Sequence, residues 1–212
     1  MQKSMIMASA AALVLLAGCE KAEAPAPAPT DTATTEVPVE TAPVEETEAT
    51  DPAHRTRALR GLFRTLVPAD MRAGIALRTP NDEAAALWRA PGRAHSGMPE
   101  FLRTVIPLVA TFGTALPRGL KVQGGIDAHR PKGRFWYLHY VGVRPVDQGK
   151  GHGGRIIRAQ TAVADTQGLP CWLETATPEN VPLYERLGFI TAAQWDVPGG
   201  GPHFWGMMRP AR

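Results

Sequence analysis

A glycine-rich turn between a buried strand and a helix constrains this sequence more than any other feature. Residues 134–143, RFWYLHYVGV, are rich in aromatic and β-branched side chains and apolar on both faces. This composition predicts a central strand that is covered on both sides. Four of the six residues from Gly149 to Gly154 are glycine, and a helix is expected to follow as far as about Gln167. The unit favours an α/β fold with a mixed sheet.

Bare backbone at the start of a helix suits a bound phosphate. A helix amino terminus presents unpaired N–H groups and the positive end of the helix dipole. Glycines let a phosphate approach that backbone closely and permit the positive φ angles of an anion-binding turn. We therefore predict a pyrophosphate site at the turn, with positive charge added by Arg144, Lys150 and Arg155. The alternative is a tight strand-to-helix connection that binds no ligand.

The dinucleotide-binding pattern and the P-loop pattern, two known glycine-rich phosphate-binding motifs, fit this turn poorly. Gly149, Gly151 and Gly154 satisfy the dinucleotide-binding spacing G-x-G-x-x-G, and Glu174 follows where such a fold binds ribose. However, Pro145 separates the glycines from the strand, and too few residues follow Glu174 for a second mononucleotide-binding half. A P-loop is excluded because the turn contains no Gly-Lys-Ser/Thr.

The third pattern extends beyond the turn. Gln148-x-x-Gly151-x-Gly153 resembles the acetyl-CoA motif of the GNAT superfamily of N-acetyltransferases. The segments YVGVRPVDQGKGHGGRII and LETATPENVPLYERLGF resemble that family's fourth strand with third helix and its fifth strand with fourth helix. The resemblance covers about residues 53–212. It implies a GNAT-like fold that transfers acetyl from acetyl-CoA to a primary amine of a small molecule or peptide, in a ternary complex and without a metal.

The resemblance also implies which residues contact acetyl-CoA. In this family the fourth and fifth strands splay apart, and the pantetheine arm of the cofactor lies between them. Backbone groups of the fourth strand would hold the arm, one N–H would polarise the thioester carbonyl, and the glycine turn would bind the pyrophosphate. The implied contact residues are Val141, Gly142, Val143, Gln148, Gly149, Lys150, Gly151, His152, Gly153 and Asn180.

Two residues are implied to move protons. Tyr184 would donate a proton to the departing CoA thiolate, as the family's usual general acid does; alternatively, its ring only packs under the sheet. Glu174 would accept the proton of the amine, directly or through a water, or it would instead pair with a neighbouring arginine. His139 lies in an apolar, aromatic run and is interpreted as a packed histidine.

The remaining elements are predicted from periodicity and turn residues. Apolar residues at helical spacing predict an amphipathic helix over residues 53–67. A second apolar helix, bent or divided at Pro107, is expected from Met98 to about Leu116. A short helix is expected at residues 178–188. Five further strands are expected at residues 73–78, 84–89, 169–175, 189–195 and 203–209. The usual first strand and first helix of the family have no counterpart in this pattern.

Residues 1–52 have the features of an export leader and a tether. Residues 1–18 begin with a basic end and a short apolar stretch, as a signal peptide does, and Leu16–Cys19 resembles the lipobox of bacterial lipoproteins. In such proteins the leader is cut before the cysteine, here Cys19, which is lipidated. Residues 19–52 are rich in Pro, Ala, Thr and Glu and are expected to be a disordered linker. The other cysteine, Cys171, is expected to be a small buried side chain.

The leader and the domain indicate different compartments. By its leader the protein is expected to be a membrane-anchored lipoprotein of the cell envelope, whereas acetyl-CoA is a cytoplasmic metabolite. Either the leader is inefficient and the enzyme works in the cytoplasm, or the tethered domain binds another anionic ligand without catalysis, or the fusion is non-functional. Residues 53–212 hold 21 basic and 11 acidic residues, which suits an anionic ligand. Since no nucleic-acid motif is present, a nucleic acid is not an expected partner.

Overall fold

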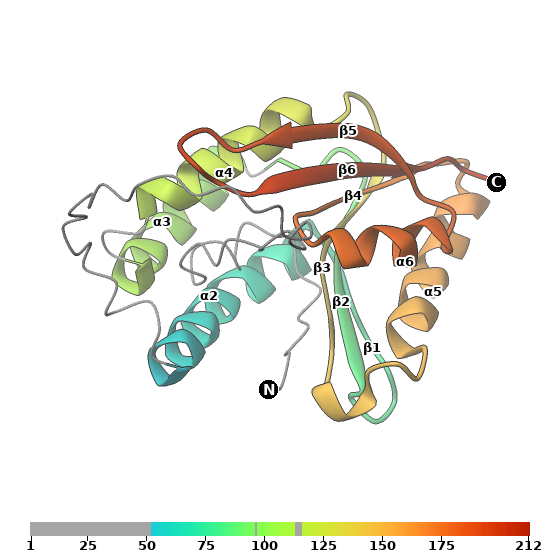
Figure 1. Ribbon diagram of the computed structural model, residues 1–212, viewed down its shortest axis with the longest axis horizontal. Helices are drawn as coiled ribbons and strands as arrows, with labels where there is room; N and C mark the ends of the chain where they lie inside the picture. Colours follow the sequence, from blue (N-terminus) through green and yellow to red (C-terminus); the bar gives the residue numbers. More distant parts are fainter. Residues whose placement is uncertain (1–51, 96, 113–115) are drawn as a thin grey trace, which may run out of the picture.

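Residues 52–95, 97–112 and 116–212 are described by the structure, a computed structural model of the chain (Figure 1). They form an α/β domain around one six-stranded mixed sheet, as expected. The predicted signal peptide, the lipidation site at Cys19 and almost all of the linker at residues 19–52 lie outside the described residues. No helix in the described ranges is long and apolar enough to cross a bilayer.

The sheet has the strand order β1-β2-β3-β4-β6-β5. Its strands are β1 (Gly74–Arg78), β2 (Ala84–Arg89), β3 (Trp136–Val143), β4 (Cys171–Thr175), β5 (Ile190–Asp196) and β6 (His203–Arg209). Neighbouring strands run antiparallel except β3 and β4, which run parallel. Five of the strands lie within the predicted segments, and β5 extends one residue beyond its own, to Asp196. Among the described residues, a helix is the first element and β1 forms one edge of the sheet.

The described helices precede, interrupt and follow the strands. They are α2 (Pro52–Ala73), α3 (Met98–Phe112), α4 (Leu116–His129), α5 (His152–Thr166) and α6 (Val181–Glu185). Short 3-10 turns at Pro145–Asp147 and Pro178–Asn180 lead toward α5 and α6. The helix after the glycine turn and the short helix near residues 178–188 agree with the prediction.

Two helices differ from the prediction. α2 continues through Pro68 to Ala73 instead of ending near residue 67, because its last turn carries the buried Ala69 and Asp70 and is held by tertiary packing. The sequence does not predict α4, since several glycines lower its intrinsic helix propensity. Its buried Val122 and Ile126 lie one turn apart, so packing stabilises it as well.

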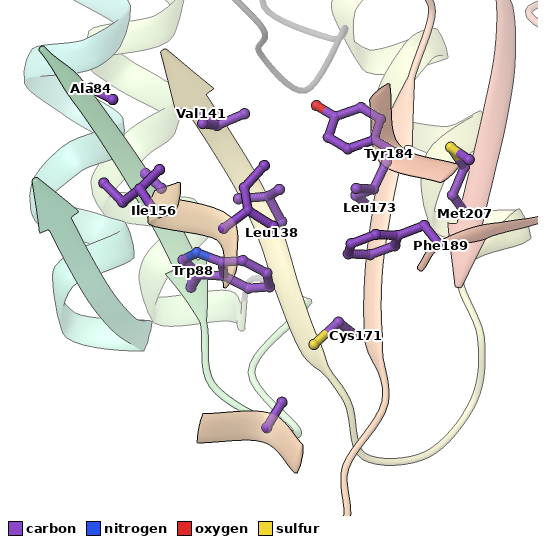
Figure 2. Close-up of a cluster of buried hydrophobic side chains, with 13 residues drawn as sticks. Ala84, Trp88, Leu138, Val141, Ile156, Cys171, Leu173, Tyr184, Phe189 and Met207 are labelled. Carbon is purple, nitrogen blue, oxygen red and sulfur yellow. The ribbon is translucent and has the colours of Figure 1, made fainter. Parts of the chain in front are cut away.

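Helices cover both faces of the strands that carry the glycine turn. On one face, called here the α5 face, Trp88 and Leu138 share the largest buried cluster with Ile157 of α5. Figure 2 shows part of this cluster. On the other face, the α2 face, Tyr140 packs with Leu62 of α2, and Figure 1 shows β1–β3 between these two helices. β3 is therefore covered on both sides, as its composition predicts.

Cys171 at the start of β4 is fully buried in the α5-face cluster, and its thiol forms no disulfide. Burial raises the pKa of this thiol to about 12. Because only the thiolate is strongly nucleophilic, Cys171 is a packing residue, as predicted.

Candidate functional site

β3 and β4 separate soon after they begin, and the site is arranged around this opening. The two strands pair at two positions, the second of which joins Tyr137 to Trp172. The register of β2 against β3 then shifts between Leu87 and Trp88, which makes His139 the extra residue of a β-bulge. A bulge bends its strand and increases the local twist, and β1–β3 diverge from β4–β6 in Figure 1. The later backbone groups of β3 that face β4 have no partner in that strand.

The glycine turn lies at the carboxyl end of β3 and leads into α5. Gly149 and Gly151 have φ angles of 75° and 80°, in the left-handed region that favours glycine. A Cβ at either position would meet no atom within 4 Å, so the space beside this backbone is open. Gly151 is the N-cap of α5, whose first N–H groups have no intrahelical acceptor. The turn therefore has the open, amide-rich form that suits a diphosphate.

Two of the cations expected to add charge at the turn are paired with an acidic residue. Asp147 accepts hydrogen bonds from Lys150 Nζ at 3.1 Å and from Arg144 Nε at 2.8 Å. Lys150 and Arg144 lower the pKa of the Asp147 carboxyl. The local net charge is therefore smaller than the sequence suggests. Gln148 Nε2 donates to the carbonyl of Val143 at 3.3 Å and ties the turn to the end of β3.

Two buried polar atoms beside the opening lack partners. Nδ1 of His152, at the start of α5, has no hydrogen-bond partner among the described residues, and the same holds for Oδ1 of Asn180, the N-cap of α6. A buried polar atom left unpaired costs about 1–3 kcal/mol. Both residues are among those implied to contact acetyl-CoA, and each carries a polar atom that a ligand group would satisfy.

Tyr184 lies one turn after Asn180, across the opening from β3. Its ring shares the α5-face cluster with Val141 and Leu173 and contacts Phe189 edge-on. Figure 2 shows the hydroxyl end of the ring directed toward the side of β3. Burial raises the pKa of this hydroxyl, so it keeps its proton at neutral pH. The ring is packed, as expected if Tyr184 has only a packing role. The hydroxyl also holds a proton, as a general acid must.

Glu174 of β4 is fully buried and lies away from that cluster. Trp172 Nε1 donates a hydrogen bond to Glu174 Oε1, and Arg130 Nε lies 3.6 Å from the same oxygen. Burial raises the pKa of the Glu174 carboxyl, and Arg130 and Trp172 oppose that rise. The arginine pairing considered as the alternative to a catalytic role is therefore present.

The α2 face also carries a buried network that the sequence does not reveal. His139 Nδ1 lies 2.8 Å from Asp70 Oδ2, and Arg89 Nε donates to Asp70 Oδ1 at 2.7 Å. Arg89 also pairs with Glu100 of α3. Asp70 lies beyond the predicted end of α2 and 69 residues before His139, so no motif spacing connects the two. The interpretation of His139 as a packed histidine missed this carboxylate.

The fold brings most of the expected site residues to the opening between β3 and β4, and it places Glu174 apart from them. Val141 shares a buried cluster with Tyr184, and Val143 packs against the glycine turn, because a Cβ at Gly153 would lie 3.2 Å from its Cγ2. The strand, the turn and α6 thus border the opening on the α5 face. Glu174 is held on the α2 side, beside Arg130.

Comparisons with known proteins agree with this geometry. Residues 109–189 match the model of the acetyltransferase (GNAT) family. A crystal structure from Corynebacterium glutamicum, described as a histone acetyltransferase and related acetyltransferase, is 25% identical, with 76% of this chain and 78% of that chain covered and a TM-score of 0.55. Arylalkylamine N-acetyltransferase 2 from Aedes aegypti has the same fold, with 11% identity, 76% and 81% coverage and a TM-score of 0.51.

Two curated relatives are uncharacterized N-acetyltransferases of Schizosaccharomyces pombe. One is 28% identical over 139 residues, which are 61% of this chain and 56% of the relative. The other is 39% identical over 62 residues, 29% of this chain and 26% of the relative. The chain therefore spans about half of the first relative and a quarter of the second. Together the comparisons support an acetyltransferase (GNAT) domain in this chain.

Proposed function

We propose that this protein transfers the acetyl group of acetyl-CoA to a primary amine by direct attack in a ternary complex. The observation that carries the proposal is the opening between β3 and β4, with an amide-rich glycine turn at its end and Tyr184 at its side. Strands that stayed paired would leave no unpaired backbone to hold a pantetheine arm.

The chain supplies binding groups and a proton in this reaction. The backbone of residues 148–153 at the α5 amino terminus would hold the diphosphate, and Asn180 would bind the arm with its unpaired Oδ1. Residues 141–143 would bind the arm as a neighbouring strand does, and one N–H would polarise the thioester carbonyl. Tyr184 would give its proton to the sulfur as the C–S bond breaks.

Amine-dependent release of a thiol tests this function directly. We expect the purified full-length protein to bind acetyl-CoA in calorimetry and to release free CoA when a panel of primary amines is added. The acetylated amine should appear in equal amount in a mass spectrum. Tight binding of acetyl-CoA without release of thiol for any amine would instead indicate the non-catalytic ligand-binding module.

We further propose that the leader anchors the domain in the cell envelope through a lipidated Cys19, with a cytoplasmic location as the alternative. Each buried CH₂ of an acyl chain contributes about 0.8 kcal/mol to membrane binding. Expressed in a bacterial host, the protein should therefore partition into the detergent phase of a phase-separation assay, and Cys19→Ala should move it to the aqueous phase. Recovery of both forms in the aqueous phase with the leader intact would favour the cytoplasm.

A further inference from the structure

We propose that the acceptor is an amine with an apolar body, bound in a cavity on the α2 face, and that His139 accepts its proton. This proposal rests on the proposed acetyl transfer and concerns the second substrate of the same site. It follows from the position of the cavity, from its lining and from a buried histidine–carboxylate pair beside it.

The cavity lies between α2 and strands β1–β3 and has a volume of about 660 Å³. Phe63 and Val67 of α2 and Leu87 and Tyr140 of the sheet form its apolar wall. Residues 141–143 of β3, the stretch proposed to hold the thioester arm, also line it. The cavity thus reaches the part of β3 at which the reaction would take place, and its volume suits a small molecule.

The cavity can hold a second substrate because the helix that follows the glycine turn and the proposed acid lie on the other face of the sheet, and only residues 141–143 are shared with the proposed cofactor site. The amino terminus of α5 approaches the Val143 side chain through Gly153, and Tyr184 belongs to the α5-face cluster. An amine in the cavity would therefore approach the opening from the face opposite to the one that carries the acid. The amine would add to one face of the planar thioester carbonyl, and the thiol would leave when the tetrahedral intermediate collapses, so the base and the acid act at different sides of the reacting carbon.

The lining selects an apolar body over a polycation. One acidic residue at the rim is already paired with a cation: Asp82 accepts from Arg78 at 2.8 Å. Glu83 accepts from the Asn81 amide at 3.0 Å, and its second oxygen, Oε2, has no hydrogen-bond partner among the described residues. The rim therefore offers one carboxylate, not two, to an ammonium group. The wall, in contrast, is aliphatic and aromatic, so burial of apolar surface is the main attraction that it offers.

His139 is not itself a lining residue of the cavity, but it contacts Tyr140 of the cavity wall and has the form of a base. The centroid of its ring is 4.1 Å from that of Tyr140, which lines the cavity. His139 and Arg89 outweigh burial and lower the pKa of Asp70, so the carboxylate is ionised and Nδ1 of His139 carries the proton that it accepts. Nε2 then holds the lone pair.

The histidine side chain keeps a small exposed fraction, whereas its carboxylate has none. The side chain of His139 is 13% exposed and that of Asp70 is 0% exposed. Burial lowers the pKa of His139, which keeps the imidazole neutral and able to accept a proton at neutral pH. In the reaction the amine proton passes to Nε2, a C–N bond forms before the C–S bond breaks, and the sulfur takes the Tyr184 proton. Asp70 acts as a positioning residue that fixes the tautomer.

The acceptor preference is tested with n-hexylamine and 2-phenylethylamine against ethanolamine and spermidine. The apolar pair should give kcat/KM values about 10- to 100-fold higher, because burial of a side chain of that size is worth one to two decades in affinity. Faster turnover of spermidine or ethanolamine would overturn the proposed acceptor class while leaving acetyl transfer intact. Release of no thiol with any of the four amines would overturn both.

A large side chain introduced into the cavity tests whether the acceptor amine binds there. Ala85 is exposed on β2 and lies opposite Gly142, so Ala85→Trp places an indole in the cavity without entering the core. KM for n-hexylamine should rise by about tenfold or more, while the KM for acetyl-CoA stays unchanged. Ala192→Trp, at an exposed position of β5, is the matched control and should change neither value. An unchanged amine KM in Ala85→Trp would place the acceptor elsewhere.

His139→Asn tests the base without breaking the network, because the Asn amide can replace Nδ1–H as the donor to Asp70. We expect kcat to fall by about 10²- to 10⁴-fold and the acidic limb of the kcat/KM profile to disappear, with the melting temperature preserved. A stable variant that kept both the rate and the limb would exclude His139 as the base. The charged or titratable groups and rings that face His139 are Asp70, Arg89, Arg130, Tyr137 and Tyr140.

Discussion

Tyr184→Phe is expected to lower kcat by about 10²- to 10⁴-fold while leaving the affinity for acetyl-CoA unchanged. The substitution removes only the hydroxyl, and the remaining ring keeps its place against Val141, Leu173 and Phe189. Without a proton donor the sulfur would leave as a thiolate, which costs transition-state energy but no ground-state binding. Single-turnover thiol release measures the rate of the chemical step, and calorimetry with acetyl-CoA measures the affinity for the cofactor.

Phe189→Leu is the packing control for this experiment. It disturbs the same buried cluster and the same ring contact but leaves the Tyr184 hydroxyl in place. Its kcat should therefore stay within a few-fold of the wild-type value, whatever the change in melting temperature. If the two variants lost kcat equally, or if Tyr184→Phe retained full turnover, the role of Tyr184 would be packing alone.

Arg130→Met is expected to lower the free energy of unfolding by about 3–5 kcal/mol. The guanidinium is 2% exposed, lies 3.6 Å from the Glu174 carboxylate and is stacked over the Tyr137 ring at 4.6 Å. Its Nη1 also donates to the Ala94 carbonyl and to Asp127. Removal of this cation leaves a carboxylate buried without compensation. A thermal melt should show a decrease of about 6–20 °C for a chain of this size.

The pH dependence of that loss identifies its cause. Burial already raises the pKa of Glu174, and without Arg130 the main opposing influence is gone, so the pKa rises further in the folded state. A carboxyl whose folded pKa lies above its unfolded value stabilises the fold below the unfolded pKa, and that stability is lost as the pH rises through the folded pKa. The variant should therefore be closest to wild type under mildly acidic conditions and least stable above neutrality.

The double variant Arg130→Met with Glu174→Gln is the matched control. The Gln side-chain oxygen can still accept the hydrogen bond from Trp172, and no charge is left buried. We expect most of the lost stability to return and the added pH dependence to vanish. A double variant that melts as low as Arg130→Met would show that the contacts of Arg130 with Ala94 and Tyr137, not the charge of Glu174, account for the loss.

Most of the secondary structure could be predicted, because it depends on neighbouring residues. The aromatic and β-branched run in residues 134–143 predicts β3, and the glycines and the periodicity after them predict the turn and α5. The prediction failed for the end of α2 and for all of α4. In both cases poor helix formers, Pro68 and the glycines of α4, are held in a helix by buried side chains whose partners are distant in the sequence.

The candidate site also has one part that the sequence predicts and another that it does not. The backbone that would bind a diphosphate is a local property: Gly149 and Gly151 adopt positive φ angles that other residues rarely do, and a helix begins directly after them. The side-chain environment is not local. Glu174 was considered as a base or as the partner of an arginine, and only the packed structure identifies Arg130 as that partner.

The strand, the glycine turn and the helix at the centre of this protein follow from the amino-acid sequence alone, because local sterics and side-chain alternation act over a few residues. The separation of β3 from β4 after Tyr137 and the 2.8 Å contact between Asp70 and His139 appear only in the folded domain. The second of these contacts forms only when α2, which carries Asp70, packs onto the sheet. That packing depends on buried surface summed over the whole domain, and no short stretch of the chain encodes it.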